Sequence, residues 1–237
     1  MPENPVAIVT GAYRGLGYET CRQLAQRGYR VILTARRVAE GIDAASALQA
    51  EGLEVEFHPL DVTSEASIQQ LAEYLRVKES GLEVLVNNAG IFPDPAPDSG
   101  QSAAANADME AIREGFETNT LGPLRLCQLL MPLMKNHGRV VNVSSGMGQL
   151  SEMNGCCPGY RLSKTALNAV TRILADEWRT SNVKINSVCP GWVKTEMGGK
   201  EAPLTCVEGA AGIVWAAMLP DDGPSGGFFR HGERIDW

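Results

Sequence analysis

A glycine-rich turn near the start of the chain constrains the fold more than any other segment. An apolar run at 5–9 leads into Thr10-Gly-Ala-Tyr-Arg-Gly-Leu-Gly17, and apolar residues at helical spacing follow over 16–26. A strand that enters a helix through such a turn presents free N–H groups and the positive end of the helix dipole. The segment predicts a phosphate-binding loop, although its spacing is G-x-x-x-G-x-G rather than the commoner G-x-G-x-x-G.

Each glycine of this turn has a separate expected use. Gly11 would allow a tight turn, Gly15 would let a pyrophosphate approach the backbone, and Gly17 would let the helix pack closely on the sheet. Leu16, between them, begins the apolar face of the helix.

Strand-like and helix-like segments alternate along the rest of the chain. Expected strands are 29–35, 53–60, 82–86, 139–143 and 183–188, and expected helices are 38–50, 64–78, 108–135 and 160–180. Apolar strands separated by helices are typical of parallel strands covered on both faces. We therefore predict an α/β Rossmann fold, a doubly wound parallel sheet of about seven strands with helices on both faces, forming a single domain over 1–237.

Two longer segments interrupt this alternation. The stretch 93–107 is rich in Pro, Ala and small polar residues, and 192–206 follows the sixth expected strand. Long loops in a compact domain are usually functional. Both lie at the carboxyl ends of strands, where open α/β sheets bind ligands. We expect them to be substrate loops.

Composition excludes several classes of protein. The 237 residues carry a net charge of −7, which argues against a nucleic-acid or membrane-surface partner. The N-terminal segment lacks the charge and apolar run of a signal peptide, and the longest apolar stretch, 210–219, is too short to cross a membrane. Six scattered cysteines without a C-x-x-C pair indicate reduced thiols in the cytoplasm and no metal site. The adjacent Cys156 and Cys157 leave a redox role as the alternative.

The end of the second strand indicates which dinucleotide would bind. NAD-binding folds place an acidic residue there, whereas this chain has Arg36 and Arg37. A guanidinium suits the additional phosphate of NADP, and Arg14 would add a second positive charge. We predict NADP (NADPH) as cofactor. The alternative is that both strand-end arginines are merely solvated.

Together with three further motifs, these residues resemble the short-chain dehydrogenase/reductase family. The turn fits T-G-x-x-x-G-x-G, 87–90 fits N-N-A-G, 160–164 fits Y-x-x-x-K, and 190–195 fits P-G-x-V-x-T. The motifs span about residues 5–230 in the family's order. The stretches LTARR, VLVNNAGI, GRVVNVSS and CPGWVKTEMGG look most like the NADPH-dependent carbonyl reductase branch.

The resemblance implies hydride transfer from NADPH to a ketone, aldehyde or quinone, with Tyr160 protonating the oxygen. It implies that Ser145 binds the substrate oxygen, Lys164 holds the nicotinamide ribose and Asn119 holds a relay water. From the residues alone Ser144 competes with Ser145. A tyrosine hydroxyl has a pKa of about 10, and we expect Lys164, one helical turn later, to lower it.

The family's remaining positions transfer to the cofactor site. Asp61 and Val62 should contact the adenine; Asn88, Ala89 and Gly90 the ribose; and Pro190, Gly191, Val193 and Thr195 the nicotinamide end, next to Tyr160 and Lys164. Tyr13 departs from the family's small polar residue, and it would stack on the adenosine or face solvent. Expected pocket walls, with an ordinary core role as the alternative, are Gly146, Met147, Leu150, Cys156, Cys157, Trp192 and Met197.

Related carbonyl reductases carry a long insertion between the serine and the tyrosine and are monomers, and this chain lacks that insertion. Helices 108–135 and 160–180, which pair across a dimer axis in the family, are then unshielded. We expect a homodimer or homotetramer.

Three alternative functions stay open at this stage. An alcohol dehydrogenase would use the same site in the oxidative direction. A non-catalytic NAD(P)-sensing protein would not need the complete set of Asn119, Ser145, Tyr160 and Lys164. An enoyl reductase of the same fold separates its tyrosine and lysine by more residues than this chain does.

Overall fold

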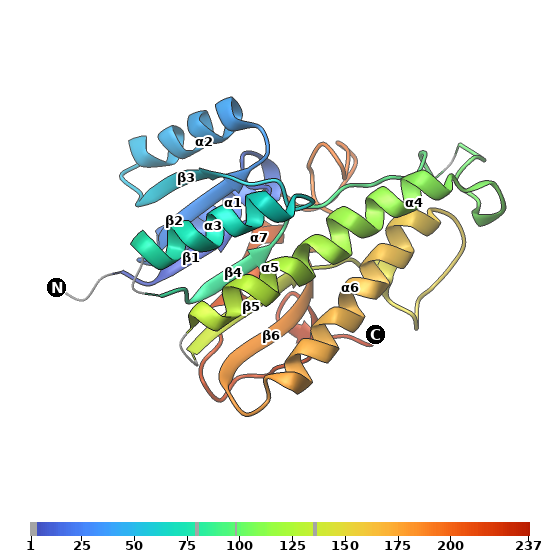
Figure 1. The fold of residues 1–237 in the computed structure, drawn as a ribbon. Coiled ribbons are helices and arrows are strands. Elements are labelled where there is room, and N and C mark those ends of the chain that lie inside the picture. Colours follow the sequence, from blue (N-terminus) through green and yellow to red (C-terminus); the bar gives the residue numbers. More distant parts are fainter. Residues whose placement is uncertain (1–3, 79–80, 98, 135–136) are drawn as a thin grey trace.

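A single sheet of eight strands runs through the molecule, in the order β3-β2-β1-β4-β5-β6-β7-β8 (Figure 1). The computed structural model describes residues 4–78, 81–97, 99–134 and 137–237. The strands are β1 (Val6–Val9), β2 (Arg30–Ala35), β3 (Val55–Pro59), β4 (Val84–Asn87), β5 (His137–Val143), β6 (Asn182–Cys189), β7 (Phe228–Arg230) and β8 (Glu233–Arg234). All neighbouring pairs are parallel except β7 and β8.

Helices cover both faces of this sheet, as the apolar strands require. They are α1 (Gly15–Ala25), α2 (Val38–Ala50), α3 (Glu65–Lys78), α4 (Met109–Phe116), α5 (Gly122–Leu130), α6 (Pro158–Glu177) and α7 (Cys206–Ala217). On one face α3, α5 and α6 pack Ile68, Leu126 and Val170 into a common core with strand residues such as Ile8. On the other face α1, α2 and α7 bury a second core. The predicted doubly wound α/β fold is confirmed, with eight strands rather than about seven.

The expected helix over 108–135 is wrong as a single element. Helix α4 ends at Phe116, a π turn spans Glu117–Leu121, α5 ends at Leu130, and a short 3-10 turn (Met131–Met134) follows. The π turn contains Asn119, whose buried side chain is bonded to other segments of the chain. Such turns inside helices frequently mark functional sites.

The expected elements ended at residue 188, but regular structure continues beyond it. The N-terminus of helix α7 is stabilised by a capping box formed by Thr205 and Glu208. Strand β7 adds to β6, with Cys189 opposite Arg230. None of the described helices combines the length and apolar character needed to cross a membrane. All six cysteines are free thiols in the structure.

Candidate functional site

The larger of two cavities opens at the carboxyl ends of β1, β4, β5 and β6, where the strand order reverses between β1 and β4. Its volume is about 680 Å³. Every residue predicted to bind the cofactor lines it, and so do Ser145, Tyr160 and Lys164. Asn119 is fully buried behind its wall. The sequence motifs, spread over nearly two hundred residues, therefore converge on one cavity at the edge of the sheet that the fold class predicts.

The glycine-rich turn presents an uncapped helix end to this cavity. Arg14 precedes α1 without a side-chain cap, and the first turn holds no acidic residue. Gly15 has a φ of +59°, a conformation that favours glycine. A Cβ at Gly17 would lie 2.5 Å from the side-chain nitrogen of Asn88. Free N–H groups at this helix end suit an anionic ligand.

Asn88 and Thr10 tie this turn to the end of β4. The hydroxyl of Thr10 accepts hydrogen bonds from the backbone N–H groups of Asn88 and Ala89, at 3.0 and 2.9 Å. The Asn88 amide nitrogen donates to the carbonyl oxygens of Thr10 and Gly11, at 2.8 and 3.1 Å. Asn88 thus holds the loop in shape, a role that we did not foresee. Its expected contact with a cofactor ribose stays a prediction.

The arginines that line the cavity differ in whether they already have an ion-pair partner. Arg14, which we expected to add a second positive charge near the phosphate, forms an ion pair with Glu196. Its guanidinium also lies over the Tyr13 ring, 5.0 Å from the centroid, and that of Arg37 lies 5.9 Å away. Arg36 has no ion-pair partner in the described part of the chain. The Tyr13 ring therefore lies close to two guanidinium groups, and Arg36 is the available cation at the end of β2.

Tyr160, Ser145 and Lys164 lie close together at the opposite end of the cavity. The Tyr160 hydroxyl lies near the Ser145 side chain, which favours the ionised form of the tyrosine. The Ser145 oxygen accepts a hydrogen bond from the N–H of Met147 at 3.1 Å. Lys164 is buried, and its ammonium donates to the carbonyl oxygen of Val143 at 2.8 Å. Ser144 is buried as well, with its hydroxyl 3.5 Å from the Lys164 carbonyl oxygen. The geometry favours Ser145 over Ser144 as the serine that meets a substrate.

Burial dominates the acidity of both titratable groups. It raises the pKa of Tyr160 to about 12, an effect that the nearby Ser145 side chain partly opposes. It lowers the pKa of Lys164 to about 8. Our expectation that Lys164 lowers the pKa of Tyr160 is therefore wrong in this structure. The ammonium is directed at Val143, 5.7 Å from the centre of the tyrosine ring, and the cost of burying each charged form outweighs their attraction.

Asn119 links the π turn to the segment after β4. Its side chain accepts from the N–H of Ile91 and donates to the carbonyl oxygen of Ile91, both at 2.9 Å, and it donates to the Ser163 hydroxyl at 3.0 Å. A Cβ at Gly90 would lie 3.2 Å from the Asn119 oxygen and 3.5 Å from the Lys164 nitrogen. Asn119 therefore fixes the backbone directly beside Lys164.

Asp94 is a site residue that the sequence analysis missed. Helix α6 begins after Cys157 without a local side-chain cap. The Asp94 carboxylate supplies one from the 93–107 segment by accepting from the N–H groups of Gly159 and Tyr160, at 2.9 and 2.7 Å. No local signal could identify this cap, because the two segments are more than sixty residues apart in sequence.

The expected pocket walls are only partly confirmed. Met147 and Met197 line the cavity, whereas the other five candidates do not. Cys157 is fully buried and adjoins Cys156, with the sulfur atoms 3.4 Å apart. Leu150 and Trp192 are instead exposed, and the Trp192 indole donates to the carbonyl oxygen of Gly198 within its own loop.

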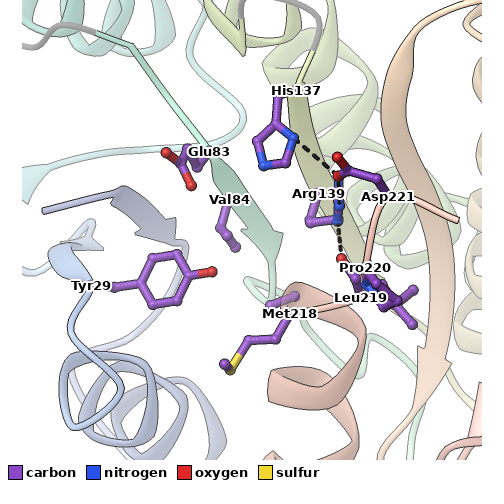
Figure 2. Close-up of a pocket in the computed structure, with 10 residues that line it drawn as sticks. Tyr29, Glu83, Val84, His137, Arg139, Met218, Leu219, Pro220 and Asp221 are labelled. Atoms are coloured by element: carbon purple, nitrogen blue, oxygen red, sulfur yellow. Dashed lines mark hydrogen bonds and ion pairs between the residues drawn. The ribbon is translucent and has the colours of Figure 1, made fainter. Parts of the chain in front are cut away.

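A second cavity of about 310 Å³ lies at the amino ends of β4 and β5 (Figure 2). Arg139 and His137 both bind Asp221 there, at 2.8 and 3.2 Å. Arg139 also donates to the carbonyl oxygen of Leu219 at 2.6 Å. Its cations are already paired and it lies at the sheet edge opposite the motifs, so we assign the functional site to the larger cavity.

Comparison with known proteins agrees with this assignment. The family model described as short chain dehydrogenase matches residues 5–203. The chain is 36% identical to (+)-neomenthol dehydrogenase of Arabidopsis thaliana, over 94% of this chain and 95% of that protein. It is 34% identical to NADPH carbonyl reductase 1 of Sus scrofa, over 98% and 94%. The structure of NADPH-bound carbonyl reductase from chicken fatty liver superposes with a TM-score of 0.84 at 29% identity, with all of both chains covered.

Proposed function

Because this chain belongs to the short-chain dehydrogenase family, we propose that it reduces the carbonyl group of a small molecule to an alcohol, with NADPH as the reductant and Tyr160 as the general acid. The observation that carries the proposal is the contact of Tyr160 with Ser145, next to buried Lys164, in one cavity with the glycine-rich turn. When bound, NADPH supplies the hydride.

The residues present fit such a cofactor. The uncapped start of α1 and the positive φ of Gly15 leave room and N–H donors for a pyrophosphate. Arg36, which has no ion-pair partner among the described residues, offers a guanidinium at the end of β2 for the ribose phosphate. Carbonyl reductases named for NADPH, and a structure bound to NADPH, are similar over nearly the whole chain. NADPH in preference to NADH is therefore part of the proposal.

The side chains around the cavity support a separate role for each of the four proposed catalytic residues. A substrate carbonyl oxygen would accept hydrogen bonds from the Tyr160 and Ser145 hydroxyls. With its pKa raised to about 12, Tyr160 is protonated at neutral pH and can act as a proton donor as negative charge develops on that oxygen. General acid catalysis of this kind contributes roughly 10²–10⁴-fold to the rate. Lys164 would hold the ribose, and Asn119 would keep the adjoining backbone in place.

The segments 93–107 and 192–206 complete the proposed substrate side. The second carries Met197, which lines the cavity and is 50% exposed. Met147 adds a further apolar side chain to the lining of the cavity. Such surroundings suit a hydrophobic ketone, aldehyde or quinone.

A homodimer or homotetramer is also part of the proposal. Exposed apolar side chains on α4 and α6, Met109, Leu162 and Ile173, support it, because such residues favour contact with another protein surface. Light scattering should give two or four times the chain mass of 25.5 kDa. A species of one chain mass at working concentration would contradict this part of the proposal.

Tyr160→Phe tests the proposed chemistry. We expect loss of NADPH-dependent reduction across a panel of ketones, aldehydes and quinones, while NADPH still binds. Tyr29→Phe, a tyrosine of the second cavity, is the matched control and should keep activity. Near wild-type turnover in Tyr160→Phe would refute the mechanism. Adding enones and the corresponding alcohols with NADP to the panel distinguishes C=C reduction and the oxidative direction.

A further inference from the structure

Arg230, the last residue of β7, is a half-buried cation that has no partner among the residues that the structure describes. Its Nε atom is buried and makes no hydrogen bond, and the side chain makes neither a hydrogen bond nor an ion pair with any residue that the structure describes. Even Glu233, opposite it across β7 and β8, is not paired with it. Burying a charge without a partner is costly.

The other described arginines that are buried or half-buried behave differently. Each of them donates to a carboxylate or a carbonyl oxygen; they are Arg22, Arg30, Arg125, Arg139 and Arg161. The chain has 28 acidic residues against 21 basic ones, so acidic partners are not scarce. Arg230 therefore stands out as a cation whose counter-charge the described chain does not supply.

The position of Arg230 relates it to the proposed substrate site. Strand β7 is paired with β6 so that Arg230 lies opposite Cys189, the residue before the Pro190-Gly191 motif. A Cβ at Gly146 would lie 2.5 Å from Nη2 of Arg230, so the guanidinium occupies the space that a side chain there would fill. Gly146 directly follows Ser145 and precedes Met147, and both of these residues line the cavity.

From this placement we infer that Arg230 binds a carboxylate of the substrate, so that the natural substrate is a carbonyl compound carrying a single negative charge, such as a keto acid. The inference rests on the proposed carbonyl reduction. With its carbonyl oxygen at Tyr160 and Ser145, a substrate would need only a short spacer to reach the guanidinium beside Gly146. A planar guanidinium suits a carboxylate through paired charge-assisted hydrogen bonds, and one unpaired cation balances one negative charge.

Two comparisons test the inference: keto acids against their methyl esters, and the variant Arg230→Gln against a control variant. The substrates are keto acids of increasing chain length and their methyl esters, which keep the ketone and remove the charge. We expect wild-type kcat/KM to favour at least one acid over its ester. Arg230→Gln should lower kcat/KM for that acid by about tenfold to a hundredfold, the contribution of a hydrogen bond between charged groups, and leave the ester unchanged. Arg234→Gln is the control, because this exposed arginine lies on the adjoining strand β8.

A second variant acts on the same interaction without removing the charge. Gly146→Ala should displace the guanidinium, because the added Cβ meets its nitrogen, and it should therefore reduce the acid-to-ester preference in the same direction as Arg230→Gln. Equal reduction of every acid and its ester by the wild type, with no selective effect of Arg230→Gln, would overturn the inference while leaving carbonyl reduction intact.

Binding without turnover separates this inference from the proposed function. Titration calorimetry with benzoate, which has no reducible ketone, should show binding to the wild type in the presence of NADPH, and at least tenfold weaker binding to Arg230→Gln. If benzoate binds in this way but no carbonyl compound is reduced, the anion site stands and the proposed reaction fails. If benzoate binds both proteins equally or neither of them, the anion site is refuted.

Discussion

The carboxylate of Asp94 accepts a hydrogen bond of 2.7 Å from the backbone N–H of Tyr160. The same carboxylate accepts from Gly159, so one side chain caps two amides in the first turn of α6. This turn carries the proposed general acid. Asp94 therefore connects the 93–107 segment to the position of the Tyr160 hydroxyl.

Replacing Asp94 with alanine should affect stability and turnover together. Loss of a helix cap costs about 1 kcal/mol in the free energy of unfolding. Because the first turn of α6 would loosen around Tyr160, we also expect kcat to fall by about tenfold or more, since misplaced catalytic groups are costly. Urea unfolding and steady-state kinetics measure the two effects, and the Kd for NADPH should not change.

Asp108→Ala provides the control, because Asp108 caps α4 in the same way by accepting from the N–H of Glu110 at 2.8 Å. It should cost similar stability and leave kcat unchanged. An equal loss of kcat in both variants would show that Asp94 has no specific role in positioning Tyr160.

The buried ammonium of Lys164 makes stability depend on pH. Its pKa is lowered from 10.5 to about 8 in the folded protein, so below about pH 8 the fold carries the full cost of the buried charge. Between about pH 8 and 10.5 the folded protein releases this proton before the unfolded chain does, and stability rises with pH. The full difference is on the order of 3 kcal/mol.

Lys164→Met should therefore be inactive yet more stable than the wild type at pH 7. This advantage in the free energy of unfolding should shrink as the pH rises from about 8 to 10.5, and urea titrations across that range measure it. The raised pKa of Tyr160 lowers stability above about pH 10, but both proteins share that effect. Lys194→Met, at an exposed lysine, should show no such trend. A pH-independent difference between Lys164→Met and the wild type would contradict the burial effect.

Much of the fold could be predicted because most helices have one apolar face and the central strands β1, β2 and β4 are mostly apolar. Helix α2 was predicted with its observed bounds, Val38–Ala50, and α1 was predicted within one residue at each end. Helix α7 lacks such a period, because apolar and small residues occupy most of its turns. Its capping box at Thr205 and Glu208 was the available local signal. Strand β7 is too short to stand out without its pairing to β6.

The site could be predicted as a set of residues but not as a network of contacts. Motif positions led to the cavity lining, because the fold brings the carboxyl ends of its strands together. The π turn at Asn119, the cap from Asp94 and the pairing of Arg14 with Glu196 depend on segments distant in sequence. The pKa of Tyr160 was misjudged for a related reason, since burial is a property of the assembled site.

Cofactor preference should depend on Arg36. In Arg36→Asp the unpaired cation at the end of β2 becomes an acidic residue of the kind that binds a ribose hydroxyl. We expect the ratio of kcat/KM for NADPH to that for NADH to invert, because the carboxylate repels the additional phosphate. Arg234→Asp controls for the change in net charge. An unchanged ratio in Arg36→Asp would refute the assignment of Arg36 to the phosphate.

The ion pair between Arg14 and Glu196 should weaken NADPH binding, since it neutralises a cation at the rim of the proposed phosphate site. Glu196→Gln should therefore lower the Kd for NADPH. Both side chains are more than half exposed, at 52% and 68%, so the gain should be only about two- to fivefold. It should diminish at high salt, which screens exposed charges. Fluorescence titration at low and high ionic strength measures both effects, and Glu201→Gln, an exposed residue of the same loop, is the control. Weaker NADPH binding in Glu196→Gln would show that the carboxylate supports the site rather than competing for it.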